Sequence, residues 1–215
     1  MLFSPLVTSS EDLAAQVAAH RRGKVPRELR RRQVLAEAHD LFIERGYHGA
    51  SMDELARRMG VSKPVVYNLA SSKEQLFRDV MAQVSQDLAQ RVALAVAAEP
   101  QVEHKLHAGI LAFLRFIQAK GDGWTALLSM EAGPASSEVA AVRREQVQLV
   151  AQLIAEGLSS SRKLEPATAQ ALAHAVNGAV ESVAVWWQAN PEVSPESLSE
   201  LLTRLLSPGL LAIAG

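Results

Sequence analysis

Apolar side chains recur at helical spacing along almost the whole chain. Between residues 27 and 44 they fall three or four positions apart, on one face of an amphipathic helix, at Val34, Leu35, Ala38, Leu41 and Phe42. Similar patterns predict helices over residues 10–22, 53–59, 62–69, 71–98, 102–119, 124–131, 137–159, 167–189 and 194–211, with Gly or Pro at most of the breaks. No stretch alternates apolar and polar residues between hairpin turns. The predicted fold class is therefore all-α.

Two short helices near the amino terminus, at residues 53–59 and 62–69, are joined by a glycine turn. Ser51 opens a capping-box pattern before the first of them, and Ser62 is placed to cap the second. Gly60 supplies the turn between them. The arrangement predicts a helix-turn-helix, whose second helix inserts its amino-terminal side chains into the major groove of DNA.

Five segments around this unit carry a more specific signal: residues 32–38 (RQVLAEA), 41–47 (LFIERGY), 51–56 (SMDELA), 60–67 (GVSKPVVY) and 72–77 (SKEQLF). Together they resemble the amino-terminal DNA-binding domain of the TetR family of transcriptional regulators, over roughly residues 28–80. The resemblance implies about nine helices: a three-helix DNA-binding domain, then a larger helical domain for ligand binding and dimerisation. We expect an amino-terminal extension with a basic arm over residues 1–26, the DNA-binding domain over 27–75 and the effector and dimer domain over 76–215.

The second short helix supplies the candidate base contacts. Lys63 can donate to guanine acceptors, and Pro64 and Val66 can contact thymine methyl groups. Asn68 can pair with adenine or face a phosphate.

By resemblance and by chemistry, Tyr67, Ser51 and Lys73 are candidate phosphate contacts, and Ser62 belongs to the same candidate surface. A structural interpretation stays open for each residue. The serines can serve only as helix caps, Tyr67 as a core aromatic and Lys73 as a solvated surface lysine.

One departure from the family pattern follows the second short helix. Leu69 and Ala70 stand where the family usually places an aromatic residue that packs against the following helix. We expect Leu69 or Phe77 to compensate, or the packing there to be looser.

A basic run precedes the helix-turn-helix and includes Arg21, Arg22, Lys24 and Arg27. Residues 1–80 hold 13 Lys and Arg against 10 Asp and Glu, although the whole chain carries a net charge of −1. The run is either an arm that contacts the DNA backbone or a solvated lead-in.

The last two long helices are the candidate dimer interface, both by resemblance and because they are rich in apolar residues. A simple core role in a monomer is the alternative. The candidate effector pocket draws on apolar side chains and a few polar ones: Phe113, Phe116, Trp124, Leu127, Met130, Glu131, Asn177 and Glu181. Plain core packing is the alternative for this set too.

The composition excludes several functions. The chain has no Cys, so disulfides, thiolate catalysis and Cys-ligated zinc are excluded. His104 and His107 are a weak metal pattern, and no catalytic motif appears, so we expect no metal, no cofactor and no enzyme activity. No apolar run is long enough to span a membrane, and a cytoplasmic location is expected.

The sequence thus predicts a homodimeric repressor that binds a palindromic operator and is released by a small hydrophobic or amphipathic effector. The alternative is an all-helical protein-interaction module whose helix-turn-helix is only structural.

Overall fold

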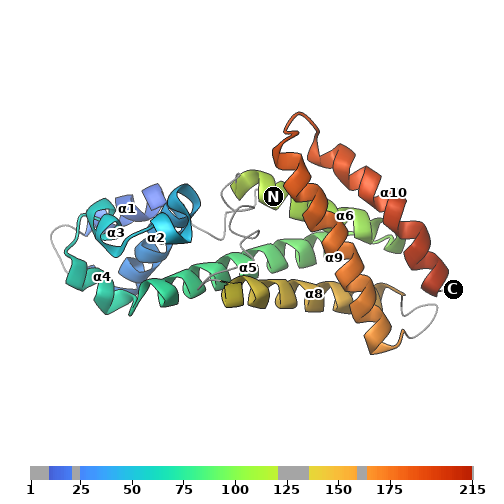
Figure 1. Ribbon diagram of the computed structural model, residues 1–215, viewed down its shortest axis with the longest axis horizontal. Helices are drawn as coiled ribbons and strands as arrows, with labels where there is room; N and C mark the ends of the chain where they lie inside the picture. The colour runs from blue at the N-terminus through green and yellow to red at the C-terminus, as the bar shows by residue number, and fades with distance from the viewer. Residues whose placement is uncertain (1–9, 21–24, 121–135, 159–163, 215) are drawn as a thin grey trace. The chain divides into compact units, whose positions relative to one another are not determined.

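The computed structural model describes residues 10–20, 25–120, 136–158 and 164–214, and these residues form nine α-helices and no strand (Figure 1). The all-α prediction is confirmed. The helices are α1 (Ser10–Ala19), α2 (Arg27–Gly49), α3 (Met52–Arg58), α4 (Lys63–Leu69), α5 (Lys73–Ala98), α6 (Val102–Lys120), α8 (Ser136–Leu158), α9 (Pro166–Gln188) and α10 (Pro195–Ala214). None of them is long and apolar enough to cross a membrane.

The chain divides into two compact units, and the division falls inside α5, between Asp87 and Leu88. The first unit contains α1 to α4 and the beginning of α5, and the second contains the rest of α5 with α6, α9, α10 and most of α8. α5 therefore runs through the boundary predicted at residues 75 and 76. The predicted helix at 124–131 lies outside the described residues.

Aromatic rings from α2 and α5 form the centre of the first unit. Phe77 meets Phe42 edge to face at a centroid distance of 5.1 Å, and it meets Tyr47 in the same way at 5.0 Å. All three rings are buried. Such pairs add to the stabilisation that their burial supplies, so this cluster fixes α2 against α5.

Two glycines with positive φ make the sharp turns of the first unit. Gly60 has a φ of 63°, and the two bonds of a Schellman motif, from its own amide to Arg57 and from Val61 to Ala56, close the end of α3. Gly46 has a φ of 66° and bends α2, which continues to Gly49 and so ends later than the predicted residue 44. Side chains rarely adopt this backbone conformation, which explains glycine at both places.

The second unit has its own core, in which one face of α9 packs against α6, α8 and α10. Ala173, Val176, Val180 and Ala184 recur on that face and are buried. Trp187 closes the end of the core, and its indole N–H donates to the Val193 carbonyl oxygen at 2.6 Å. The opposite face of α9 is exposed and carries Val185 and Trp186.

α10 differs from its predicted end. The predicted helix ends at residue 211, but α10 continues to Ala214 with Pro208 inside it. The proline has no amide to donate to the carbonyl of Arg204, so the helix passes this point with one fewer backbone bond.

Candidate nucleic-acid interface and ligand cavity

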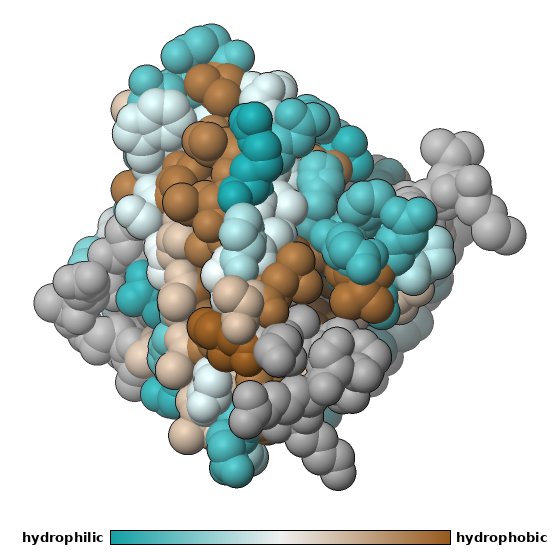
Figure 2. All heavy atoms as spheres, turned by 90° about the vertical axis from the view of Figure 1, so that its right-hand side faces the viewer, coloured by the Kyte–Doolittle hydropathy of each residue, from teal (hydrophilic) through white to brown (hydrophobic). Residues whose placement is uncertain are grey.

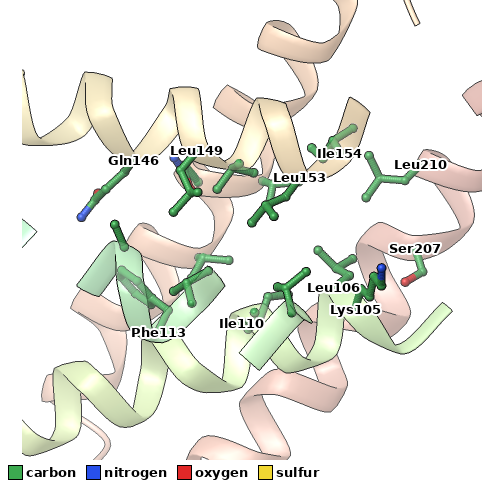
Figure 3. A pocket seen from close by; sticks show the side chains of 18 of the residues that line it. Lys105, Leu106, Ile110, Phe113, Gln146, Leu149, Leu153, Ile154, Ser207 and Leu210 are labelled. Atoms are coloured by element: carbon green, nitrogen blue, oxygen red, sulfur yellow. The ribbon is translucent and has the colours of Figure 1, made fainter. Parts of the chain in front are cut away.

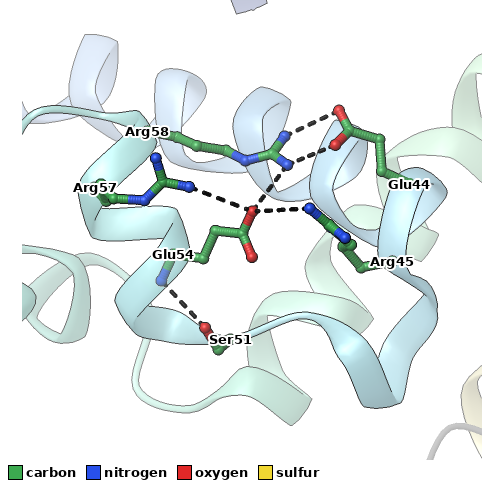
Figure 4. Close-up of polar contacts among 6 residues, drawn as sticks. All are labelled: Glu44, Arg45, Ser51, Glu54, Arg57 and Arg58. Atoms are coloured by element: carbon green, nitrogen blue, oxygen red, sulfur yellow. Dashed lines mark hydrogen bonds and ion pairs between the residues drawn. The ribbon is translucent and has the colours of Figure 1, made fainter.

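Ser51 caps α3. Its hydroxyl oxygen accepts a hydrogen bond from the Glu54 amide at 3.1 Å, so the capping interpretation of this exposed serine is supported. The reciprocal half of the predicted capping box is absent here, because the Glu54 carboxylate turns toward arginines instead (Figure 4).

A network of arginines and glutamates fixes α3 to α2. Arg58 donates two hydrogen bonds to Glu44 and another, at 3.1 Å, to Glu54, while Arg57 and Arg45 face Glu54 from further away (Figure 4). The hydrogen bond from Arg58 lowers the pKa of Glu44, and that same bond raises the pKa of Arg58. Bidentate geometry between two helices limits their relative rotation, so this network positions the helix-turn-helix.

α4 begins at a cap whose hydroxyl is not used. Ser62 occupies the N-cap position and its backbone carbonyl accepts from Val65, but its side chain makes no capping hydrogen bond. Pro64 in the first turn needs no amide partner there. The exposed Ser62 hydroxyl is therefore available to an external acceptor or donor.

The side chains of α4 divide into one buried anchor and an exposed surface. Val66 has no exposed area, and it packs α4 against the rest of the first unit. The prediction that Val66 contacts bases is wrong for this reason, and the exposed neighbour Val65 takes the outward position. Tyr67 is 43% exposed, which excludes the core interpretation of this ring. The other exposed candidates are Lys63, Pro64 and Asn68.

The predicted base reader Lys63 is engaged in an ion pair. Its ammonium nitrogen lies 2.8 Å from a carboxylate oxygen of Asp53 in α3. The hydrogen bond that Lys63 donates to Asp53 raises the pKa of Lys63, so the lysine stays charged. Sequence spacing gave no signal for this pair, because the two residues lie on different helices.

Lys73 is docked rather than simply solvated. Its ammonium lies 4.7 Å from the centroid of the Tyr47 ring and donates to the His48 carbonyl oxygen at 3.3 Å. Burial lowers its pKa. Ser72 directly precedes α5, and its hydroxyl oxygen accepts a hydrogen bond from the Gln75 amide at 3.1 Å. Lys73 is thus held in one place at a helix amino terminus, where anions are favoured.

At the position where the family usually has an aromatic residue, this chain has a small alanine beside a surface depression. Ala70 is buried, and with Leu69 it lines a mostly polar depression whose other walls come from the start of α2 and from α5. Arg31 and Asp79, which also line it, form an ion pair with 3.6 Å between the guanidinium nitrogen and the carboxylate oxygen. The cluster of Phe77, Phe42 and Tyr47 therefore supplies the aromatic packing of the unit, and the space beside Ala70 stays open.

The basic arm is only partly described. Arg27 is exposed at the first residue of α2, whereas Arg21, Arg22 and Lys24 lie outside the described residues. Arg27 also lines the depression beside Ala70.

The second unit contains an apolar cavity of about 160 Å³ that is partly open to solvent and lies between α8 on one side and α6 on the other, with α10 at one end (Figure 3). α5 and α9 complete its wall. Apolar side chains make up most of the lining, including Leu88, Val92, Leu106, Ile110, Phe113, Leu149, Leu153, Ile154, Val180 and Leu210.

Of the predicted pocket residues, Phe113 and Asn177 line this cavity. Phe116 is buried elsewhere, with the charged groups of Arg91 and Lys120 near its ring. Glu181 does not line it either, because its carboxylate pairs with Arg143 at 3.3 Å, and burial raises its pKa. Trp124, Leu127, Met130 and Glu131 lie outside the described residues.

Two polar side chains of the cavity wall carry unused hydrogen-bond donors. The Nε2 atom of Gln146 and the Nδ2 atom of Asn177 are buried and have no partner among the described residues. The sequence did not indicate Gln146, because the spacing of apolar residues in α8 does not show which of its polar side chains lines the cavity.

An exposed apolar surface runs along the last two helices. Trp186 on α9 is 50% exposed, and on α10 Leu201 and Leu205 are 53% and 70% exposed. Hydrophobic atoms also gather in a band on the face of the second unit where α10 ends (Figure 2). Isolated exposed apolar residues are ordinary, but a series on adjacent helices is typical of an interface.

The two weak metal candidates turn to different partners. His104 faces Glu99 at 3.9 Å, and His107 contacts the buried Ser199 hydroxyl at 3.2 Å. Within the described parts of the chain, no three His, Asp or Glu side chains come close enough together to hold a metal ion.

Comparison with known proteins covers both units. Residues 34–80 match the family described as bacterial regulatory proteins, tetR family, and residues 102–209 match the tetracyclin repressor-like C-terminal domain. The HTH-type transcriptional activator FasR of Mycolicibacterium smegmatis is 41% identical over 106 residues, which are 49% of this chain and 48% of FasR. The nucleoid occlusion factor SlmA of Haemophilus influenzae is 28% identical over 55% of each chain. The alignments thus span about half the length of these relatives.

Solved structures extend the similarity to most of the chain. A tetR-family transcriptional regulator from Streptomyces coelicolor superimposes with a TM-score of 0.71 at 26% identity, over 87% of this chain and 82% of that one. A TetR-like regulator from Rhodococcus gives 0.67 at 29% identity, over 87% and 99%. FadR from Bacillus subtilis, solved in complex with stearoyl-CoA, shares the fold with a TM-score of 0.70 at 16% identity, over 82% and 97%. The family is one of DNA-binding transcriptional regulators, not of enzymes. On the two domain matches and these neighbours, the chain belongs to the TetR family.

Proposed function

We propose that this protein is a ligand-responsive regulator that reads a palindromic operator with α4, dimerises through α9 and α10, and binds an apolar effector in the cavity of the second unit. The observation that carries the proposal is the division of α4 into one buried anchor, Val66, and an exposed polar surface. A helix that served only to pack would not present Lys63, Tyr67 and Asn68 together.

The proposed DNA surface has chemistry for both bases and phosphates. Lys63 and Asn68 carry the donors that guanine and adenine edges accept. The hydroxyls of Ser51, Ser62 and Tyr67 and the docked ammonium of Lys73 suit phosphate oxygens, which fix register without reading sequence. Arg27, with Arg21, Arg22 and Lys24, extends the positive charge toward the backbone.

Dimerisation through α9 and α10 is supported by their exposed apolar residues. Trp186, Leu201 and Leu205 would be buried if two copies packed these helices against each other. A two-fold dimer presents two recognition helices, and two successive major grooves on one side of DNA lie about 34 Å apart. We place the protein in the cytoplasm, where operator DNA is accessible.

The effector role is supported by the cavity. Its lining is apolar with few polar groups, which is the usual character of a small-molecule site. A ligand releases DNA only if it binds the DNA-incompatible state more tightly, so its effect is limited by that difference in affinity.

Repression is the proposed direction, because a dimer on an operator that overlaps a promoter blocks polymerase without any further contact. The related FasR is named an activator. A reporter carrying the selected operator, first overlapping and then upstream of a promoter, separates the two directions: repression predicts lower expression in the overlapping arrangement and no rise in the upstream one.

The test begins with selection of binding sites from random-sequence DNA by the purified full chain. We expect enrichment of two inverted half-sites with centres about 10 base pairs apart. The variant Lys63→Met should weaken binding and relax the preference at one position of each half-site. Failure to enrich any sequence at low salt would overturn the operator proposal.

A further inference from the structure

Polar side chains lie at both ends of the cavity, and Glu103 and Asn177 also belong to its lining. Gln146 lies at one end beside Phe113, and Lys105 and Ser207 lie at the other, with leucine and isoleucine side chains between them (Figure 3). A ligand that fills the cavity therefore meets amide chemistry at one end and an ammonium at the other.

Gln146 on α8 and Asn177 on α9 both lie near the place where an ion pair connects the two helices, which we call the α8–α9 joint. The ion pair of Arg143 with Glu181 connects the two helices at 3.3 Å. Gln146 follows Arg143 by three residues on α8, and Asn177 precedes Glu181 by four on α9, so each amide lies one helical turn from that ion pair.

The unused atoms at this joint are donors. Gln146 is only 8% exposed, and the amide nitrogens of both residues are buried without a partner in the described structure. Leaving a buried donor unpaired is unfavourable, and buried polar groups are nearly always paired. A ligand that places an acceptor at this joint would pair them.

The electrostatics of the joint favour an uncharged acceptor. The guanidinium of Arg143 is already balanced by the Glu181 carboxylate, so the pair offers no net positive charge to an anion. An incoming carboxylate would also meet Glu181 one turn away and would lose its hydration in an apolar cavity. The oxygen of a ketone, ester, lactone or amide avoids both penalties.

The size of the cavity limits the part of the ligand that it holds. At about 160 Å³ it is close to the engineered apolar cavity of ~150 Å³ that binds one benzene molecule. The cavity itself therefore holds a ligand part of about the size of one aromatic ring.

We propose that Gln146 and Asn177 are the specificity-determining residues of the cavity, and that they donate hydrogen bonds to the carbonyl oxygen of an uncharged, otherwise apolar ligand. This inference rests on the proposed function of the cavity as the effector site.

The test compares two probes of the same shape, acetophenone and α-methylstyrene, in which a CH₂ group replaces the carbonyl oxygen. Dissociation constants are measured by calorimetric titration of the full chain, and the ratio of the two affinities is the readout. Against wild type, Gln146→Met and Asn177→Leu should each reduce the preference for acetophenone by roughly threefold to tenfold, the worth of one hydrogen bond.

Two further variants serve as controls. Ile154→Val changes the apolar wall and should alter both affinities but not their ratio. Gln146→Glu turns the donor into an acceptor and should lower the ratio as Gln146→Met does. If Gln146→Met melts far below the wild type, Gln146→Glu provides the test of Gln146 instead.

The outcomes separate the inference from the proposed function. If the wild type binds neither probe up to its solubility limit, the cavity is not a ligand site and both fall. If both probes bind and the ratio is unchanged in the Gln146 and Asn177 variants, the site stands and this inference falls. The inference also falls if benzoate binds more tightly than acetophenone and Lys105→Met abolishes that binding, because the ligand is then read as an anion at the other end.

Discussion

The ammonium nitrogen of Lys63 lies 2.8 Å from a carboxylate oxygen of Asp53, so an acidic residue of α3 holds the first side chain of α4. Both side chains are more than half exposed. DNA must compete with Asp53 for this lysine, and the aspartate itself repels phosphate.

Replacing Asp53 by Asn should therefore strengthen DNA binding. We expect a gain of about twofold to fivefold, the range found for exposed charge pairs, and a smaller gain at high salt. Fluorescence anisotropy on the selected operator at several salt concentrations measures it. Glu192→Gln removes one exposed negative charge from the second unit and is the matched control; an equal gain there would show that net charge alone is responsible.

Removing the hydroxyl of Tyr67 should weaken DNA binding without affecting stability. The ring is 43% exposed, so Tyr67→Phe keeps its packing and loses only the group proposed to contact phosphate. The expected loss is roughly threefold to tenfold, uniform across operator sequences. A loss confined to particular base substitutions would mean that Tyr67 reads bases instead.

Breaking the Arg58 network should destabilise the first unit in a pH-dependent way. Arg58→Met leaves Glu44 and Glu54 without their shared guanidinium, and we expect a cost of about 1–2 kcal/mol near pH 7, since the Glu44 side chain is half exposed. The pKa of Glu44 is lowered in the folded protein, so its contribution is present above its ordinary value of 4.5 and is lost as the pH falls below that value.

Urea unfolding of wild type and Arg58→Met at pH 7 and at successively lower pH checks this prediction. The difference between the two proteins should shrink on acidification. A constant difference would show that Arg58 stabilises the unit through packing alone.

Introducing a charge on the exposed surface of α10 should produce a monomer. Leu205 is 70% exposed in the single chain, so Leu205→Glu should leave the fold intact while opposing the apolar contact proposed between two copies. Sedimentation at micromolar concentration should show a fall from dimer to monomer, together with loss of palindrome binding. Leu94→Glu changes another exposed leucine, on α5, and should remain dimeric. A dimeric Leu205→Glu protein would place the interface elsewhere.

Local signals predicted the helices well, because caps, glycine turns and apolar spacing act within a few residues. Ser51 and Gly60 occupy the cap and the turn that the sequence indicates. Local patterns did not show which of two neighbouring apolar residues is buried. Val65 and Val66 are the same residue type at adjacent positions, and the sequence alone does not decide which of them packs against the rest of the unit.

The cavity was harder to predict, since its wall comes from five helices far apart in the chain. An aromatic such as Phe113 was identified because large apolar residues are conspicuous. Gln146 was missed because it lies beside Phe113 of α6, a helix tens of residues away in sequence (Figure 3).

The division of the chain between Asp87 and Leu88 also has an evolutionary consequence. The proposed base contacts lie within the seven residues of α4 in one unit, while the residues that line the cavity are distributed over five helices of the other. Single substitutions in the cavity can therefore change which small molecule is sensed without altering the DNA sequence that is read. After gene duplication, two such proteins could acquire separate signals for the same set of target genes one mutation at a time.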